Sequence, residues 1–283
     1  SSTTWTSYLH ASLYDLVKGS IVQRFHSKHS DMFSVRSNRT NSIYVRVLKS
    51  GNDAIRCNMA RPPFETRERI STTLTEEMSR RKNRPYFFTF VRNPLAHFMS
   101  GYNELVWRKI DASNHRSSAD GQRRQCKSLP WHRVQECVGP GGRVPLQDGM
   151  RFFREFIVSL LEDDLRNHVT WPEHVYSQSS VFYVRTIDFV GKLPLIKWHW
   201  RDLQIQLGIA EEEVKEFNTS LGVRESSLDP YGTYRAAKVA VATSAHIKQA
   251  LCLVLWADYA NLNYTLPDEC LQLDLLAKSV IRG

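Results

Sequence analysis

Residues 42–60 read Ser-Ile-Tyr-Val-Arg-Val-Leu-Lys-Ser-Gly-Asn-Asp-Ala-Ile-Arg-Cys-Asn-Met-Ala. The first part, Ser42 to Leu48, is β-branched and mostly apolar, which predicts a strand. A short polar turn, Lys49 to Asp53, follows, and Ala54 to Ala60 is compatible with a helix. A lysine in a tight glycine-containing turn directly before a helix offers one anion a cation, backbone N–H groups and the positive end of the helix dipole. This stretch therefore predicts a phosphate-binding corner between a strand and a helix.

Two common phosphate-binding motifs are absent from the sequence. Lys49 precedes Gly51, and neither G-x-x-x-x-G-K-[ST] nor G-x-G-x-x-G occurs anywhere in the chain. An ordinary nucleoside triphosphatase is therefore disfavoured, and a small kinase or nucleotide hydrolase is the weaker enzymatic alternative. Taken alone, a Lys-Ser-Gly turn also fits an ordinary surface turn.

A second motif follows the strand predicted over Tyr86 to Val91. The strand ends in Arg92, after which Asn93 suits a helix N-cap and Pro94 the first helical position. Ser100 lies two turns into the predicted helix. Because the carboxyl ends of strands line the ligand crevice of a doubly wound sheet, we expect both motifs at the same sheet edge. Together they predict a nucleotide site with two anion subsites.

The alternation of strands and helices predicts the fold class. We expect an α/β fold with a doubly wound, mainly parallel sheet flanked by helices, in a single domain over residues 1–283. The other predicted elements are helices at Trp5 to His26, Glu65 to Lys82, Met150 to Leu161, Leu195 to Leu207 and Thr243 to Ala260, and a strand near Val181 to Thr186.

Residues 108–148 lack apolar periodicity and are rich in glycine, proline, serine, arginine and glutamine. We expect an inserted loop region with little regular structure. Its basic residues lie around Trp131 and fit either a solvated loop or a surface that grips a sulfated or carboxylated glycan. These residues are Arg108, Lys109, Arg116, Arg123, Arg124, Lys127 and Arg133. Trp198 and Trp200, in a later helical pattern, are expected to pack in the core and at its edge rather than to form a sugar platform.

The composition limits the class of protein. Hydrophobic residues make up 42% of the 283 residues, so the chain can bury a core and is neither a disordered chain nor a short peptide. Lysine and arginine number 38 against 29 acids, which gives a net charge of +9. This charge favours nucleotides, nucleic acid, acidic glycans or membrane headgroups as ligands. No recognition helix, zinc finger or RNP signature accompanies it, so we do not expect a nucleic-acid partner.

The five cysteines bear on metal binding and on compartment. They show no CxxC or Cys/His spacing, so no metal site is expected. Cys126 and Cys137 could be bridged, as could Cys252 and Cys270, which would leave Cys57 free. Three sequons would suit a secretory compartment. They begin at Asn38, Asn218 and Asn263.

At the two anion motifs the chain resembles the sulfotransferases that use 3′-phosphoadenosine 5′-phosphosulfate (PAPS), and it is most similar to their Golgi carbohydrate branch. In that family a strand leads into a P-K-[TS]-G-[TS]-[TS] loop. Its place is taken here by Lys49, Ser50, Gly51, Asn52, Asp53 and Ala54. The family's R-[DN]-P-x-x-R-x-x-S motif is matched by Arg92, Asn93, Pro94 and Ser100, with His97 where a second arginine is usual.

Three later segments extend the resemblance over residues 42–264. The segment from His174 to Gln178 resembles H-W-x-P-Q, and Ile187 to Lys192 resembles the Y-D-x-I-G-K strand and turn. Trp256 to Tyr264 resembles the closing Y-x-x-D-F-x-x-F-G-Y.

The resemblance implies transfer of a sulfuryl group from PAPS to a hydroxyl or amine, with adenosine 3′,5′-bisphosphate as the product and no metal. It implies that the loop from Lys49 to Ala54 holds the 5′-phosphosulfate, and that Arg92 and Ser100 hold the 3′-phosphate. The Lys49 ammonium would stabilise charge on the bridging oxygen as the S–O bond breaks. Asp53 departs from the family's hydroxyls and would repel the phosphosulfate, unless it turns away as a helix N-cap.

A hydroxyl acceptor also needs a general base. We favour His174, because its segment has a counterpart in the family, although a hydrogen bond without proton transfer is the alternative for this residue. The other candidates are His97, which fits support of the 3′-phosphate or packing, and Glu65 and Glu68, which fit a solvated face.

A carbohydrate is the expected acceptor, with a small metabolite or a tyrosine side chain as alternatives. The non-enzymatic alternative is a protein of this fold that has lost transfer and binds acidic glycans through its basic insertion. The sequence contains no stretch of about 18 apolar residues, the length that a membrane-spanning helix needs, and it begins at Ser1 without a leader. The resemblance to the Golgi branch implies the Golgi lumen, which a trimmed type II membrane protein would fit, with the cytoplasm as the alternative location.

Overall fold

The computed structural model describes residues 34–47, 49–65, 68–70, 77–78, 80–114, 130–138, 142–166, 175, 177–180, 187–221 and 229–271. The chain divides into two compact units. The sheet unit is drawn from residues 24–97 and 177–225, and the helical unit from 1–23, 98–176 and 226–283. The single domain expected over residues 1–283 stays a prediction.

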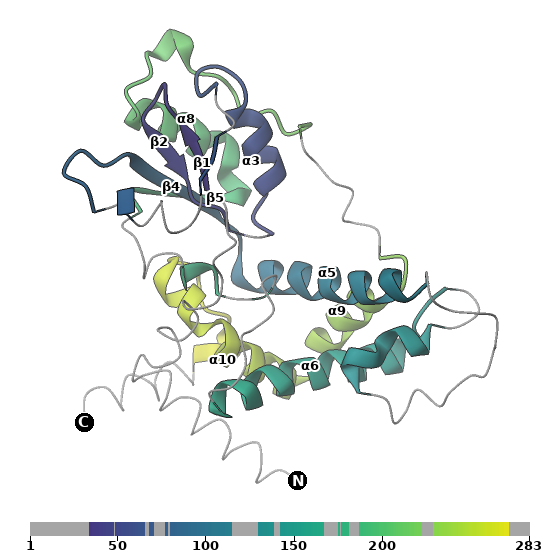
Figure 1. The fold of residues 1–283 in the computed structure, drawn as a ribbon. Coiled ribbons are helices and arrows are strands. Elements are labelled where there is room, and N and C mark those ends of the chain that lie inside the picture. Colours follow the sequence, from purple (N-terminus) through teal and green to yellow (C-terminus); the bar gives the residue numbers. More distant parts are fainter. Residues whose placement is uncertain are drawn as a thin grey trace, which may run out of the picture. The chain divides into compact units, whose positions relative to one another are not determined.

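The sheet unit is built on five strands in the order β3-β1-β2-β4-β5. The strands are β1 (Ser34–Ser37), β2 (Ser42–Tyr44), β3 (Glu68–Ile70), β4 (Tyr86–Val91) and β5 (Phe189–Lys192). β1 pairs antiparallel with β2 and β3, whereas β4 pairs parallel with β2 and β5 (Figure 1). The α/β class is confirmed, but the sheet is mixed rather than mainly parallel.

A hairpin between β1 and β2 accounts for this difference. Its connection, residues 38–41, ends in Asn41 with φ of 44°, a left-handed conformation that asparagine tolerates. Such a short connection can join only antiparallel strands, because parallel strands need a longer crossover. The strand predicted over Tyr86 to Val91 is confirmed as β4, and the helix predicted over Glu65 to Lys82 is wrong at β3.

Two helices pack on one face of the sheet. They are α3 (Asn52–Met59) and α8 (Ile196–Gln206), and the latter follows the short 3-10 turn η5 (Leu193–Leu195). The fully buried side chains of Phe88 and Phe90 contribute to the core beneath them. This core also contains Val35, Tyr44, Ile55, Met59, Phe64, Phe189, Trp200, Leu203 and Phe217. A second cluster, on the side of Phe87, contains Ile43, Val45, Val47, Ile70 and Met78.

An ion pair fixes the start of β4 to the residue before β5. Arg84 donates to both carboxylate oxygens of Asp188 at 2.7 and 2.5 Å, and the Phe87 amide donates to the same carboxylate at 2.8 Å. Burial alone would raise the pKa of Asp188, but the hydrogen bonds from Arg84 and Phe87 lower it below its usual value. Asp188 therefore supports the sheet as a carboxylate.

The described part of the helical unit contains four α-helices and a 3-10 turn. They are α5 (Pro94–Asn114, whose first turn belongs to the sheet unit), η3 (Trp131–Cys137), α6 (Leu146–Arg166), α9 (Thr233–Thr243) and α10 (Ala245–Asn261). The helices predicted over Met150 to Leu161 and Thr243 to Ala260 correspond to α6 and α10. The loop predicted over residues 108–148 is wrong where α5 continues, at η3 and where α6 begins.

Aromatic side chains pack α5 against α6. Phe98 and Tyr102 of α5 meet Phe153 and Phe156 of α6 with ring centroids 4.8 to 6.3 Å apart. Tyr102 is fully buried, and this burial raises the pKa of its phenol. α6 and α9 approach closely at Gly149, where a Cβ would lie 2.6 Å from the Cβ of Ala236.

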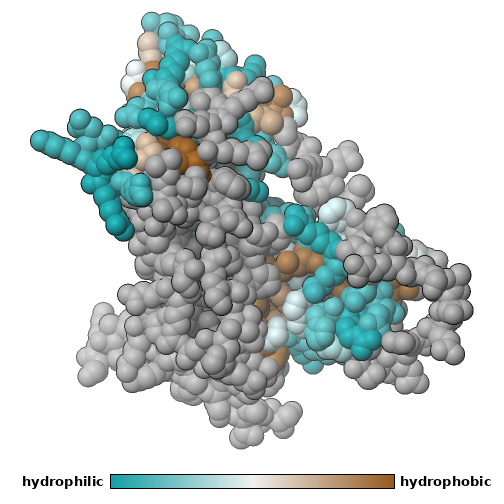
Figure 2. Space-filling model, viewed as in Figure 1, coloured by the Kyte–Doolittle hydropathy of each residue, from teal (hydrophilic) through white to brown (hydrophobic). Residues whose placement is uncertain are grey.

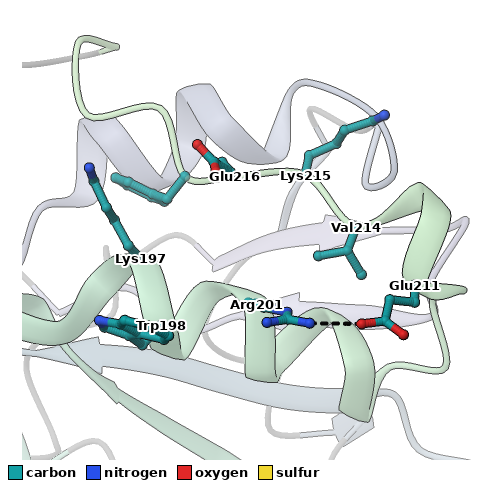
Figure 3. Close-up of a pocket in the computed structure, with 8 residues that line it drawn as sticks. Lys197, Trp198, Arg201, Glu211, Val214, Lys215 and Glu216 are labelled. Carbon is teal, nitrogen blue, oxygen red and sulfur yellow. Dashed lines mark hydrogen bonds and ion pairs between the residues drawn. The ribbon is translucent and has the colours of Figure 1, made fainter.

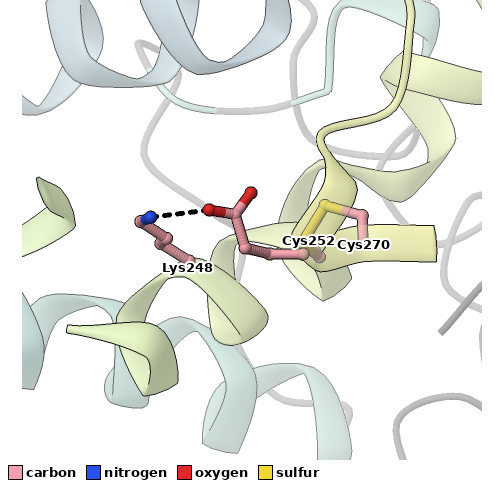
Figure 4. Close-up of a disulfide and its surroundings, with 4 residues drawn as sticks. Lys248, Cys252 and Cys270 are labelled. Carbon is pink, nitrogen blue, oxygen red and sulfur yellow. Dashed lines mark hydrogen bonds and ion pairs between the residues drawn. A yellow bond between two sulfur atoms is a disulfide. The ribbon is translucent and has the colours of Figure 1, made fainter. Parts of the chain in front are cut away.

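A disulfide joins Cys252, in the middle of α10, to Cys270, beyond the C-terminal end of that helix (Figure 4). Lys248 and Glu269 form an ion pair beside it at 2.6 Å. This bond confirms one of the two pairings considered from the sequence, and Cys57 is free and exposed. The other pairing involves Cys126, which lies outside the described residues.

Hydrophilic residues cover most of the described surface in the view of Figure 2.

Among the described residues, no single helix has the length and apolar character to cross a membrane. The helices α9 and α10 satisfy those two criteria only as a pair, bent by 103°. The helix predicted over Trp5 to His26 and the strand near Val181 to Thr186 lie outside the described residues.

Candidate functional site

The two predicted anion motifs leave the sheet at the same edge. β2 and β4 are parallel neighbours, with Tyr44 opposite Phe88. The pairing continues past β2, because the Val45 amide donates to the Phe88 carbonyl at 2.8 Å and the Thr89 hydroxyl donates to the Val45 carbonyl at 2.7 Å. Both chains therefore run on in the same direction, one into Lys49 and the other into Arg92.

The first corner turns tightly into α3. Lys49 has φ of 60° and Gly51 has φ of 72°, so two of the first three residues of this corner have a left-handed backbone conformation. Gly51 is the N-cap of α3, and its carbonyl accepts from the Ile55 amide at 3.0 Å. A Cβ on Gly51 would lie 3.0 Å from Leu193, so both conformation and space favour glycine here. Asp53 is not the N-cap that the sequence suggested, because glycine turns the chain into the helix two residues earlier.

The side chains of this corner have definite positions. Ser50 is fully buried, whereas Lys49 and Asp53 are half-buried. Asn52 is buried and its side-chain oxygen accepts from the Tyr44 hydroxyl at 2.6 Å, which ties the first turn of α3 to β2. Asp53 lies 3.8 Å from Arg56, one turn further along α3. The Asn52 side chain therefore supports the loop from within, and the corner's backbone is held in place around it.

The second corner begins at Arg92 and is capped as predicted. The side-chain oxygen of Asn93 accepts from the Ala96 amide at 3.1 Å, and its carbonyl accepts from the His97 amide at 2.8 Å. Pro94 is the first residue of α5, and the N-cap assignment is confirmed. Ser100 lies in α5 beyond the point where the helical unit begins, so its place beside Arg92 stays a prediction.

Gln178 joins the two corners. It lies in the 3-10 turn η4 (Gln178–Ser180), and its side chain is fully buried. Its side-chain oxygen accepts from the Ser50 hydroxyl at 3.0 Å and from the Arg92 amide at 2.8 Å. Its side-chain nitrogen donates to the Arg92 carbonyl at 2.8 Å. The sequence alone assigns this residue no role, and its only signal is its place as the glutamine that ends the H-W-x-P-Q-like segment.

The candidates for a general base differ in environment. His97 is fully buried in the first turn of α5. Glu65 is exposed and forms an ion pair with Arg39 at 3.3 Å, which agrees with a solvated face. His174 lies outside the described residues, and the side chain of Glu68 is not described. The identity of the base therefore stays a prediction.

A groove of about 560 Å³ lies between α8 and the segment that follows the 3-10 turn η6 (Glu211–Glu213). Figure 3 shows Lys197 and Trp198 on α8, with Arg201 joined to Glu211 at 2.8 Å. The segment across the groove contributes Val214, Lys215, Glu216 and Phe217. Trp198 is 70% exposed, so its prediction as a packing residue is wrong, whereas Trp200 is buried in the core as predicted. The difference arises because successive residues of a helix face different directions.

Several basic residues of the predicted insertion have acidic or aromatic neighbours within the helical unit. Arg108 pairs with Glu104 at 2.8 Å, and Arg133 pairs with Glu136 at 2.5 Å. Lys109 lies over the ring of Trp131, 5.1 Å from its centroid. These contacts favour a solvated, internally paired surface for this part. Arg116, Arg123, Arg124 and Lys127 lie outside the described residues.

Within the described ranges, no group of three or more histidine, cysteine, aspartate or glutamate residues could hold a metal ion.

Comparison with known proteins gives one match. A sequence model described as "Sulfotransferase family" matches residues 2–265. No curated protein and no solved structure matches the chain.

Proposed function

Because the chain belongs to the sulfotransferase family, we propose that it transfers a sulfuryl group from PAPS to a hydroxyl or amine and releases adenosine 3′,5′-bisphosphate. One observation carries this proposal. The corners at Lys49 and Arg92 follow parallel neighbouring strands and are bonded to the same buried amide of Gln178. Two cationic corners held together at one sheet edge suit a nucleotide with phosphates at two positions.

The first corner has the features of a site for the 5′-phosphosulfate. The left-handed Lys49 and Gly51 bring the backbone into a tight turn, and α3 directs its first amides and its positive dipole end toward that turn. When PAPS is bound, it supplies an activated sulfuryl group whose S–O bond breaks as the acceptor oxygen or nitrogen attacks sulfur. The electron pair of that bond passes to the bridging oxygen, where the Lys49 ammonium can stabilise the developing charge.

The other residues have assignments that follow from the family's motif. Arg92 and Ser100 would bind the 3′-phosphate, and the segment from Ser50 to Ala54 would hold the phosphosulfate through backbone N–H groups. His174 would accept the proton of an acceptor hydroxyl as general base. No step in this proposal passes through a metal ion.

A carbohydrate acceptor is favoured by the groove beside α8. An exposed indole such as Trp198 can pack against the apolar face of a sugar ring, while nearby ammonium and carboxylate groups hydrogen-bond its hydroxyls. Lys197, Lys215 and Glu216 line the same groove. A Cβ on Gly51 would lie 3.0 Å from Leu193, in the turn that leads into α8, so the helix that carries Lys197 and Trp198 begins beside the first corner. A small metabolite or a tyrosine side chain would use this surface less fully.

A Golgi location is supported by two features. The disulfide between Cys252 and Cys270 suits an oxidising compartment. Two sequon asparagines, Asn38 and Asn263, are exposed and accessible to glycosylation.

The function can be tested with radiolabelled PAPS and a panel of acidic glycans, neutral oligosaccharides, small hydroxylated molecules and a tyrosine peptide. Wild type is expected to label a glycan, and Lys49→Ala is expected to lower turnover at saturating PAPS by about 100- to 1000-fold. Lys82→Ala, which changes an exposed lysine elsewhere in the sheet unit, is the control and should keep wild-type turnover. Wild-type turnover in Lys49→Ala would contradict the proposal.

The non-enzymatic alternative is a glycan-binding protein that has lost transfer, and Asp53 in the phosphosulfate corner is the observation that favours it. A thermal-shift titration separates the two functions. Stabilisation by adenosine 3′,5′-bisphosphate supports the transferase, whereas binding to heparin without stabilisation by the nucleotide supports the glycan-binding protein.

A further inference from the structure

Gln178 lies at the junction of the two corners but has no place in the chemistry of transfer. Its amide is fully buried, and three of its hydrogen bonds reach residues 128 and 86 positions away in the sequence. Two of the bonds go to the backbone of Arg92, one to its N–H and one to its C=O. The third comes from the Ser50 hydroxyl. A single side chain therefore fixes both the start of the second corner and the middle of the first.

The chemistry of the partners requires an amide at this position. Ser50 and the Arg92 amide both donate, so they need an acceptor, and the Arg92 carbonyl needs a donor. A carboxamide offers an acceptor and a donor from one planar group, and the partners fix its orientation, with the oxygen toward the Ser50 hydroxyl and the Arg92 N–H and the nitrogen toward the Arg92 carbonyl. A carboxylate of the same shape would place a second oxygen against the Arg92 carbonyl. A hydrocarbon of the same size would leave three buried polar groups without a partner.

We infer that Gln178 is a positioning residue that holds the Ser50 corner and the Arg92 corner at the separation needed by a ligand with two phosphates. This inference rests on the proposed function, because it concerns how the same site recognises adenosine 3′,5′-bisphosphate. A ligand with one phosphate occupies one corner and does not depend on the distance between the two. A ligand with two phosphates gains from both corners only when they are held at the matching distance before it binds.

The inference predicts a selective loss. In Gln178→Glu, affinity for adenosine 3′,5′-bisphosphate should fall about 10-fold or more, while the affinities for adenosine 5′-monophosphate and adenosine 3′-monophosphate each change less than about 3-fold. Ser50→Ala removes the bond to the first corner alone and should lower the bisphosphate-to-monophosphate affinity ratio in the same direction. Ser179→Ala is the matched control, since Ser179 is also fully buried in η4 and its hydroxyl pairs with that of Ser177 at 2.8 Å.

The experiment is isothermal titration calorimetry of the full chain with each of the three nucleotides. The inference is supported if the ratio of bisphosphate affinity to monophosphate affinity falls in Gln178→Glu and in Ser50→Ala but keeps its wild-type value in Ser179→Ala. An unchanged ratio in both variants overturns it and leaves the proposed function intact, provided that wild type prefers the bisphosphate. Equal loss of all three nucleotides also overturns it, because general damage to the site would act in that way.

Two further outcomes are decided by the same data. Should Gln178→Glu fail to fold, the ratio in Ser50→Ala alone decides, since that variant keeps both bonds between Gln178 and Arg92. A wild-type protein that binds none of the nucleotides, or prefers a monophosphate, overturns the proposed donor and this inference together.

Discussion

Lys49 adopts a backbone conformation that should make glycine more stable than alanine at its position. Its φ of 60° is left-handed, which costs an L-residue with a Cβ about 1–2 kcal/mol. Glycine has no Cβ and avoids this cost. It also makes the unfolded chain more flexible, which opposes folding by about 0.5–1 kcal/mol. The balance predicts that Lys49→Gly has a free energy of unfolding about 0.5–1 kcal/mol higher than Lys49→Ala. Both variants lack the ammonium, so their difference reports the backbone alone.

The matched control is Lys192 in β5, which is half-buried like Lys49 but has φ of −106°. At an ordinary conformation glycine is less stable than alanine, so Lys192→Gly should be less stable than Lys192→Ala by about 0.5–1 kcal/mol. Urea denaturation of the four variants measures both differences in the free energy of unfolding. The comparison is made with one common slope (m-value) for the dependence of that free energy on urea concentration. The reasoning fails if the glycine-minus-alanine difference has the same sign at the two positions.

This result bears on function because a strained residue is retained only where its side chain is needed. Lys49→Gly should combine higher stability than Lys49→Ala with the same loss of sulfuryl transfer. If Lys49→Gly were also more stable than wild type while losing the reaction, the lysine would be identified as a residue kept for chemistry rather than for folding.

Three other predictions concern stability. In Gly191→Ala the new Cβ would lie 2.2 Å from the ring of Phe90, so thermal denaturation should show a loss of about 1–3 kcal/mol; an unchanged midpoint would mean that β4 and β5 are not packed as described. Asp188→Asn should lose about 1.5–3 kcal/mol at pH 7. Because the folded pKa of Asp188 lies below its unfolded value, the carboxylate's contribution is present above the unfolded pKa and is lost as pH falls through the folded pKa. Urea titrations from pH 7 to pH 3 should therefore show the difference from wild type shrinking, and a constant difference would contradict it. Replacing Cys252 and Cys270 by serine removes a bond across 18 residues and should cost about 3 kcal/mol, a loss that reduction of wild type should reproduce.

The local parts of the fold could be predicted from sequence. The strand at Tyr86 to Val91 and the cap at Asn93 depend on neighbouring residues, whose apolar run and side-chain oxygen act within a few positions. β1 and β3 could not be predicted in this way, because each is short and is stabilised by its partner strand rather than by its own pattern. The helix predicted across Glu65 to Lys82 is wrong at Glu68–Ile70 for the same reason, since pairing with β1 outweighed the local pattern there.

The candidate site divides in the same manner. The motifs at Lys49 and Arg92 indicate anion binding only when taken together, because parallel strands bring them to one edge. Gln178 could not be found, because its function depends on contacts with Ser50 and Arg92, far away in the sequence. A glutamine in a polar segment has no local pattern that distinguishes a buried crosslink from a surface residue.

Asp53 is the residue that speaks against anion binding in the first corner, and its position weakens that objection. It lies in the first turn of α3 and is 3.8 Å from Arg56, with both side chains 34% exposed. Water and the guanidinium both reduce its field, so its repulsion of a phosphosulfate is a modest term. The lysine is carried on the turn itself, whereas the aspartate is carried on the helix after Gly51. In the proposed site, the amides of the turn and the helix dipole would act on the same anion as Lys49. The balance at this corner therefore favours an anion, despite the carboxylate that the family's loop does not have.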